Sequence, residues 1–313
     1  MSKKKISIII PFYGQTVEQL ALPLGSINGQ IGIDFSEIDV HLVNDGGEKI
    51  DRSAFDIFQN LDIKMHDLKE NAGPGIARQY GIDHSDGRYI MFVDADDLLG
   101  GPGVVLGFLN VLNPQVDLIY SDYVEEVKHG DKYSYISHDS NTSMGAVYAK
   151  LFKRSLLVEN DIKFHPDLPF FEDQYFTTIA STYSKNRVDI HQPSYIWRYS
   201  PGSLFRSSLS KNESRTDIYA KSLRYQLDFF SKKGFTDLKV FTLNSLLKIY
   251  MHQKIDGTLG NAQVYKETKK IAKYLAPLNE QMIYAMVEQM IEKNTQYKSL
   301  SQNEVKAYFE KIL

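Results

Sequence analysis

The chain has 313 residues, of which 42% are hydrophobic and 24% are charged, with a formal net charge of −3 and no cysteine. This length allows one large domain with an attachment, or two domains. The net charge argues against a nucleic-acid-binding protein that relies on overall positive charge. The lack of cysteine excludes disulfides, thiolate metal sites and cysteine nucleophiles.

The N-terminal segment predicts neither a signal peptide nor a membrane anchor. Its apolar run is interrupted at Pro11, which is too early for the hydrophobic region of a signal peptide. Nowhere does the chain offer the roughly 18 consecutive apolar residues of a membrane span. We therefore expect a cytoplasmic protein, with peripheral attachment at the inner membrane face as the alternative.

Short apolar runs near the N-terminus predict strands, which cover residues 6–11, 38–43, 61–65, 89–93 and 116–120. Stretches of helix length separate the first four of them, at residues 16–29, 48–60 and 73–85. This alternation predicts an α/β fold whose mostly parallel sheet is covered by helices on both faces. Ligands of such sheets bind beyond the carboxyl ends of the strands.

Polar or flexible residues follow three of these strands, as "PFYG" (residues 11–14), "NDGG" (residues 44–47) and "DADD" (residues 94–97). Each tetrapeptide is also typical of an ordinary turn. Because the carboxyl ends of parallel strands meet at one edge of a sheet, their joint occurrence favours a ligand crevice there.

The acidic cluster after the fourth strand is compatible with a metal site. Asp94 and Asp96 alternate along the chain, so both side chains can face one ligand. Mg²⁺ and Mn²⁺ take one or two carboxylates together with phosphate oxygens and waters. For Asp97 the alternative is a cap of a helix or turn.

The second half of the chain changes character. We expect helices at residues 148–160 and 172–184 and an almost entirely helical segment after the polar residues 211–217. Residues 1–210 and 211–313 are therefore predicted to be separate domains. In the second, one helical face is expected to carry six apolar residues as core or contact positions: Met282, Ile283, Met286, Val287, Met290 and Ile291.

Five motifs, in this order, resemble those of a family 2 glycosyltransferase with the GT-A fold. They are "SIIIPFYG" (residues 7–14), "VNDGG" (43–47), "NAGPGIARQYGI" (71–82), "DGRYIMFVDADD" (86–97) and "FFEDQYF" (170–176). The resemblance extends over about residues 5–200. It implies an inverting transferase that uses a nucleoside diphosphate sugar, usually a UDP sugar, with Mn²⁺ or Mg²⁺. The implied acceptor is a hydroxyl of a glycan, glycolipid or glycoprotein.

The resemblance also assigns residues to the nucleotide. Asp45 matches the acidic residue that hydrogen-bonds uracil, and Pro11 and Tyr13 match the wall beside the base. Asn71 and Arg78 match polar residues of the nucleotide pocket.

Glycine and proline near these residues suit a ligand loop. Gly73 lets the backbone approach a ligand, and Pro74 can open the helix that follows. The alternatives are a tight turn for Gly73 and a solvated helix face for Arg78.

The remaining assignments concern the diphosphate and the chemistry. Asp94 matches a residue near the ribose, Ala95 lies beside it in the donor site, and Asp96 matches the metal ligand. Asp173 resembles the general base, and Glu172 is implied either to orient this base or to contact hydroxyls of the acceptor or donor. Acidic residues in a first helical turn are also stabilising by themselves, which is the alternative for this pair.

A later aromatic and basic segment adds two candidates. Arg198 is expected to approach the diphosphate and Trp197 to stack on a sugar. Packing or a surface contact is the alternative for both.

The sequence departs from the family pattern at Gly14, Gly47 and Gln79, which weakens the implied preference for uridine. The rival functions are a sugar nucleotidyltransferase and a catalytically silent nucleotide-sugar-binding or scaffolding module. For the helical end, intramolecular packing, a homo-oligomer, a membrane surface and acceptor recognition are the open roles.

Overall fold

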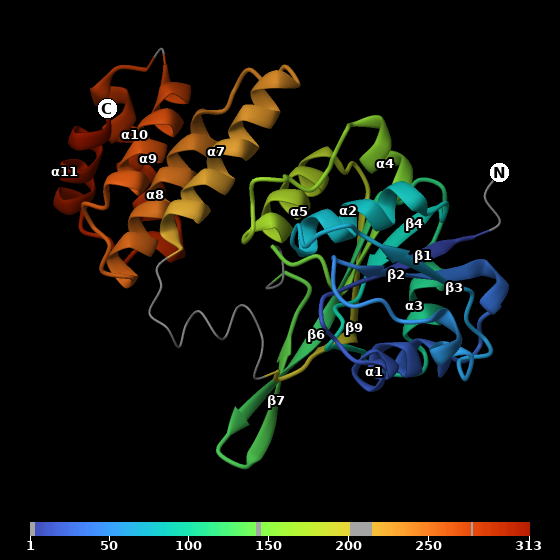
Figure 1. Ribbon diagram of the computed structural model, residues 1–313. Helices are drawn as coiled ribbons and strands as arrows, with labels where there is room; N and C mark the ends of the chain where they lie inside the picture. Colours follow the sequence, from blue (N-terminus) through green and yellow to red (C-terminus); the bar gives the residue numbers. More distant parts are fainter. Residues whose placement is uncertain (1–3, 142–144, 201–214, 277) are drawn as a thin grey trace. The chain divides into compact units, whose positions relative to one another are not determined.

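The computed structural model describes residues 4–141, 145–200, 215–276 and 278–313 (Figure 1). The chain divides into two compact units, residues 1–207 and 208–313. This division and the domain boundary predicted between residues 210 and 211 both fall in residues 201–214, outside the described residues.

Four parallel strands form one half of the sheet in the first unit. They are β1 (Ile6–Phe12), β2 (Ile38–Asn44), β3 (Ile63–Asp67) and β4 (Tyr89–Phe92), in the spatial order β3-β2-β1-β4. Every residue of β1, β2 and β4 is buried, as in a sheet covered on both faces. The predicted parallel sheet is thus confirmed in this half.

The other half of the sheet is mixed. After β4 it continues with β8 (Lys150–Lys153), β6 (Leu118–His129), β9 (Arg187–Trp197) and the short β5 (Leu98–Leu99). β8 is antiparallel to both neighbours, whereas β6 and β9 are parallel. β7 (Lys132–His138) pairs with β6 in a hairpin that projects away from the sheet (Figure 1).

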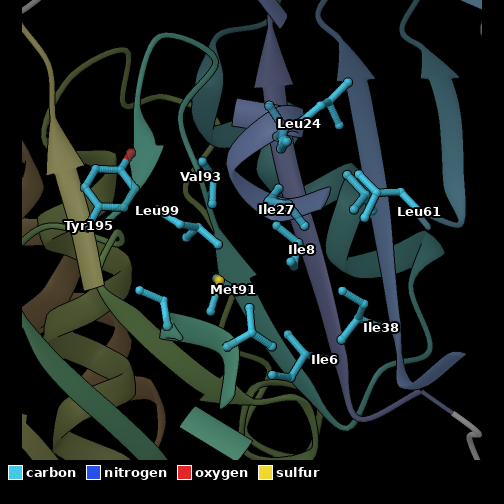
Figure 2. Packing of buried hydrophobic residues seen from close by; sticks show 14 of the residues in the cluster. Ile6, Ile8, Leu24, Ile27, Ile38, Leu61, Met91, Val93, Leu99 and Tyr195 are labelled. Carbon is cyan, nitrogen blue, oxygen red and sulfur yellow. The ribbon is translucent and has the colours of Figure 1, made fainter. Parts of the chain in front are cut away.

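Helices cover both faces of this sheet (Figure 1). α1 (Val17–Asn28) and α3 (Val104–Val111) lie on one face. α2 (Pro74–His84), α4 (Arg154–Glu159) and α5 (Glu172–Tyr183) lie on the other. Figure 2 shows the core under α1, where Leu24 and Ile27 pack near Ile8 of β1 and Met91 of β4.

Two predicted helices are wrong in part or whole. Residues 48–60 contain only a 3₁₀ turn, Arg52–Phe55, because the buried residues Phe55, Phe58 and Leu61 recur every third position. Backbone hydrogen bonds of the i to i+3 type follow this spacing. In residues 148–160, the first part is β8, because Leu151 and Phe152 are buried between β4 and β6.

The second unit is helical over its described residues. It contains α7 (Thr216–Lys232), α8 (Lys239–Ile255), α9 (Ala262–Ala272), α10 (Glu280–Lys293) and α11 (Gln302–Ile312). The buried face of α10 consists of Ile283, Val287 and Ile291. Met282 is 53% exposed and so does not belong to this buried face, which leaves the contact alternative for it. No helix in the described part of the chain combines the length and apolarity needed to cross a lipid bilayer.

Candidate active site

The guanidinium of Arg78 joins three of the carboxylates that the sequence predicted for the site. Its Nη1 donates to Asp173 Oδ1 at 2.8 Å and to Glu172 Oε1 at 3.1 Å, and its Nη2 donates to Asp94 Oδ1 at 2.7 Å. Arg78 is only 4% exposed, which rules out the solvated helix face. The end of β4 and the helices α2 and α5 therefore converge on one side chain.

Glycines at the start of α2 permit this convergence. Gly73 adopts φ of +90°, a conformation that favours glycine, and Pro74 then opens the helix as predicted. Gly75 lies against α5, since a Cβ on it would stand 3.0 Å from Glu172 Cγ. Phe171, just before α5, has φ of +61°, which is unusual for a bulky residue. This bend places Glu172 and Asp173 in the first turn of α5.

The electrostatics of the cluster favour a proton acceptor. Burial raises the pKa of Asp173 well above its usual range, and Glu172 and Asp94 add to this, whereas Arg78 opposes it. Burial lowers the pKa of the Arg78 guanidinium, but the three carboxylates outweigh this effect, so the pKa lies above its ordinary value. A carboxylate whose pKa is raised is a better match for general base catalysis near neutral pH.

The acidic turn after β4 is held by the end of β9. The backbone N–H of Asp94 donates to Tyr195 Oη at 3.0 Å, and Tyr195 Oη donates to Asp97 Oδ2 at 2.7 Å. Asp97 Oδ1 accepts from the backbone N–H of Arg198 at 2.8 Å. Asp97 is buried and β5 follows it, so it is not a helix cap. Sequence reasoning missed Tyr195, whose position in β9 carries no local signal of this contact.

Asp96 is suited to a divalent cation. Burial raises the pKa of its carboxyl and the neighbouring Asp94 adds to this, while Ser200 and Arg198 oppose it. The described residues contain no cluster of three or more histidine or acidic side chains able to hold a metal by themselves. Mg²⁺ and Mn²⁺ do not need one, because phosphate oxygens and waters complete their coordination. The donor set at Asp96 thus fits such an ion bound together with a diphosphate.

Asp45 fixes the loop between β3 and α2. Its Oδ1 accepts from the N–H of Ala72 at 2.9 Å and its Oδ2 from the N–H of Gly73 at 2.8 Å. Asp45 is buried, which raises its pKa, and the two amide hydrogen bonds oppose this. The loop that carries Asn71 and Gly73 is therefore anchored to the end of β2.

The ends of β1 and β2 adjoin each other. A Cβ on Gly47 would stand 3.2 Å from the backbone nitrogen of Gly14 and 3.6 Å from Tyr13 Cδ2. Tyr13 is 56% exposed, whereas Pro11 is buried within β1. Of the two residues assigned to the wall beside the base, Tyr13 thus has the open ring surface. Asn71 is exposed and Ala95 is buried.

Of the two later candidates, Trp197 packs and Arg198 lies at the acidic turn. The Trp197 ring stacks on Tyr148 with a centroid distance of 6.3 Å and packs against the core, as in the packing alternative. Arg198 Nη1 donates to the backbone carbonyl of Asp96 at 3.4 Å. Arg198 thus adjoins the proposed metal ligand.

The sheet with its flanking helices is the GT-A fold. The structure of S. aureus TarS residues 1–349 matches with a TM-score of 0.66, over 90% of this chain and 83% of that chain, at 17% identity. The complex of the same fragment with UDP-GlcNAc gives a TM-score of 0.58. The mannosyltransferase PcManGT from Pyrobaculum calidifontis, solved with GDP-Man and Mn²⁺, gives 0.50 over 98% and 85% of the two chains, at 14% identity.

Residues 7–155 match the family described as Glycosyl transferase family 2, so the chain contains a domain of that family. A curated relative is the poly(ribitol-phosphate) beta-N-acetylglucosaminyltransferase TarP of Staphylococcus aureus strain N315. It is 29% identical over 198 residues, which cover 58% of this chain and 59% of TarP. The protein is a glycosyltransferase, and the family and fold predicted from its motifs are confirmed.

Proposed function

We propose that the chain transfers a hexose or N-acetylhexosamine from a UDP sugar to a hydroxyl of a glycan, glycolipid or glycoprotein, with inversion at the anomeric carbon. The observation that carries this proposal is the cluster of Asp94, Glu172 and Asp173 around Arg78, at the carboxyl end of β4. The binding of UDP-GlcNAc by TarS and the N-acetylglucosaminyl transfer named for TarP support this class of donor.

In this mechanism the Asp173 carboxylate is the general base. It takes the proton of the acceptor hydroxyl while that oxygen forms a bond to the anomeric carbon, and the bond from this carbon to the diphosphate breaks on the opposite side. A single displacement of this kind inverts the configuration. Arg78 and Glu172 hold the base in place through the contacts described above.

The donor is assigned to the strand ends. Asp94 binds near the ribose, the loop of Asn71 and Gly73 lies beside the nucleotide with Asp45 and Tyr13, and Arg198 faces the diphosphate. Asp96 would hold Mn²⁺ or Mg²⁺, which when bound neutralises charge on the leaving diphosphate. The Mn²⁺ of PcManGT supports a divalent ion here.

Release of UDP from a panel of UDP sugars, with and without Mn²⁺, tests this assignment. Asp96→Ala and Asp173→Asn should each lower turnover by about 100-fold or more, since each removes a group acting on the transition state. Asp83→Asn is the matched control, because within the described part of the chain this exposed carboxylate on α2 hydrogen-bonds only Gln79. Turnover like that of the wild type in both site variants would refute the assignment.

The same assay separates the rival functions. A sugar nucleotidyltransferase would release pyrophosphate from a nucleoside triphosphate and a sugar phosphate, and a silent module would release no nucleotide. We assign catalysis to residues 1–210, and we propose a homo-oligomer or a membrane surface as partner of residues 211–313. Light scattering and vesicle sedimentation of the full chain test these partners.

A further inference from the structure

Lys150 is a buried lysine that the proposed mechanism does not use. It lies in β8, between β4 and β6, and its exposed fraction is 0%. Its Nζ stands 4.5 Å from the centroid of the Tyr120 ring and donates to the carbonyl of Tyr148 at 3.4 Å. The residue before it, Ala149, has φ of +54°, which is rare for a residue other than glycine.

This lysine lies near the last turn of α5, the helix whose first turn carries the proposed base. Asp173, Thr177 and Ser181 follow one another at four-residue spacing along one face of α5. Thr177 Oγ1 donates to the carbonyl of Ala146, and Ser181 Oγ hydrogen-bonds Tyr120 Oη at 2.5 Å. This face of α5 is therefore attached to the Tyr120 ring, on which the Lys150 ammonium also lies.

The carboxylates around the proposed base outnumber the guanidinium that contacts them, so a second cation would be stabilising there. Within the described cluster, Arg78 is the cation that hydrogen-bonds Asp94, Glu172 and Asp173. Three carboxylates therefore share one guanidinium. The charge of Asp173 also acts on Lys150, where it favours the ammonium form. A buried positive charge on the sheet side of α5 would offset part of the excess negative charge.

We propose that Lys150 is a positioning residue for the transfer reaction: its buried ammonium acts together with Arg78 to keep the Asp173 carboxylate ionised before the acceptor binds. This inference rests on the proposed role of Asp173 as the base. It assigns to Lys150 no contact with donor or acceptor.

The groups that face Lys150 set its own charge. Burial lowers the pKa of Lys150 to about 7, Asp173 on α5 opposes this, and Arg187 of β9 reinforces it. The Arg187 guanidinium lies 4.0 Å from the Tyr120 ring centroid and pairs with Asp189. The support that Lys150 gives to Asp173 is thus present below about pH 7 and fades above it.

The decisive measurement is the titration of the Asp173 carboxyl itself, observed by carbon NMR of the full chain labelled with [4-¹³C]aspartate. The resonance is assigned by its loss in Asp173→Asn. In Lys150→Met, which keeps the length of the side chain but removes its charge, the titration midpoint should rise by at least about half a pH unit. Lys150→Arg, which keeps the charge, should return the Asp173 midpoint to the wild-type value.

Lys153→Met is the matched control. Lys153 lies in the same strand, but its Nζ donates to the carbonyl of Pro114 and pairs with Asp117 at 3.3 Å. The Asp173 midpoint should not move in this variant. If Lys150→Met folds poorly, Lys150→Gln supplies the same comparison. An unchanged midpoint in a folded neutral variant overturns the inference.

Kinetics provide a second readout. With a donor that the wild type turns over, the acidic limb of the profile of kcat/KM against pH should shift upward in Lys150→Met by the same amount, with little change in the KM of the donor. A purely structural role would lower stability without moving this limb. If the wild type releases UDP from no donor, the proposed function fails, and the carboxyl titration still decides the inference.

Discussion

Arg78 faces three carboxylates with one positive charge, and its side chain is almost fully buried. Removing one partner of a buried charge cluster leaves the others uncompensated, which typically costs about 3–5 kcal/mol. We expect Arg78→Met to lower the free energy of unfolding by about 3 kcal/mol and to abolish UDP release. Urea unfolding followed by circular dichroism measures the first effect.

Arg52→Met is the matched control for this prediction. Arg52 pairs with Asp56 at the surface and donates to the carbonyl of Ile63, so its loss should cost about 1 kcal/mol and leave turnover intact. Equal losses of stability in the two variants would contradict the account of the Arg78 cluster.

The titration of Lys150 predicts how stability depends on pH. The pKa of Lys150 is about 7 in the folded chain, against an ordinary value of 10.5, so between these values the unfolded chain binds more protons. Stability should therefore rise with pH, by about 1 kcal/mol per unit from pH 7 to 9. Lys150→Met should remove this rise, as measured by urea unfolding at pH 7, 8 and 9. A slope equal to that of the wild type would show that Lys150 is not neutral in the folded chain.

At the scale of residues, sequence motifs identify candidates but not their partners. Asp94, Asp96 and Asp173 stand out because they follow an apolar strand or open a helix. Arg78 meets Asp173 across 95 positions of the chain, and the N–H of Asp94 meets Tyr195 across 101. No local pattern reports such contacts. The functional roles of these residues stay predictions.

Tyr195 ties two elements together, since its hydroxyl accepts from the Asp94 amide and donates to Asp97. Tyr195→Phe leaves both groups without this partner in a buried place, which should cost about 1–3 kcal/mol and weaken UDP binding several-fold. Calorimetric titration with UDP and Mn²⁺ measures the affinity.

Tyr89→Phe is the control for the hydroxyl. Tyr89 is equally buried, and its hydroxyl donates to the carbonyls of Asn113 and Val116, at the opposite end of β4 from Asp94. Tyr89→Phe should lower the free energy of unfolding without changing the affinity for UDP. If both variants bind UDP like the wild type, the two hydrogen bonds of the Tyr195 hydroxyl do not shape the proposed donor site.

The contact between α2 and α5 depends on the missing side chain of Gly75. In Gly75→Ala the new methyl would press on the side chain of Glu172, which must shift by a few tenths of an ångström. We expect kcat to fall about tenfold with a stability loss of about 1 kcal/mol. Gly103→Ala is the control, because it has φ of −100° and its Cβ would meet no atom within 4 Å.

At the scale of elements, the buried parallel strands were predictable from the sequence, whereas the mixed half of the sheet was less so. The runs that became β1, β2 and β4 are apolar throughout, which is typical of strands covered on both faces. Residues 150–153 were expected to be helical, because an apolar segment of this length fits either structure. Only pairing with β4 and β6 decides for a strand.

At the scale of the whole molecule, ligand binding should raise the free energy of unfolding. A ligand that binds only the folded chain adds about 2.7 kcal/mol at 100 times its dissociation constant. UDP with Mn²⁺ should therefore raise the unfolding temperature, and EDTA or Asp96→Asn should remove most of the increase. Thermal unfolding followed by circular dichroism measures this. An increase with UDP that EDTA leaves unchanged would contradict the proposed metal at Asp96.

The two hydrogen bonds that Asp45 accepts from Ala72 and Gly73 affect the thermodynamics of recognition. A loop that becomes ordered only when a nucleotide arrives loses conformational entropy at that moment, and the affinity falls accordingly. Here the segment is already tied to the end of β2, so this entropy is lost during folding. The proposed donor site is preorganised at this loop, and Asp45→Ala should make nucleotide binding entropically more costly, in addition to removing the contact proposed for Asp45 itself.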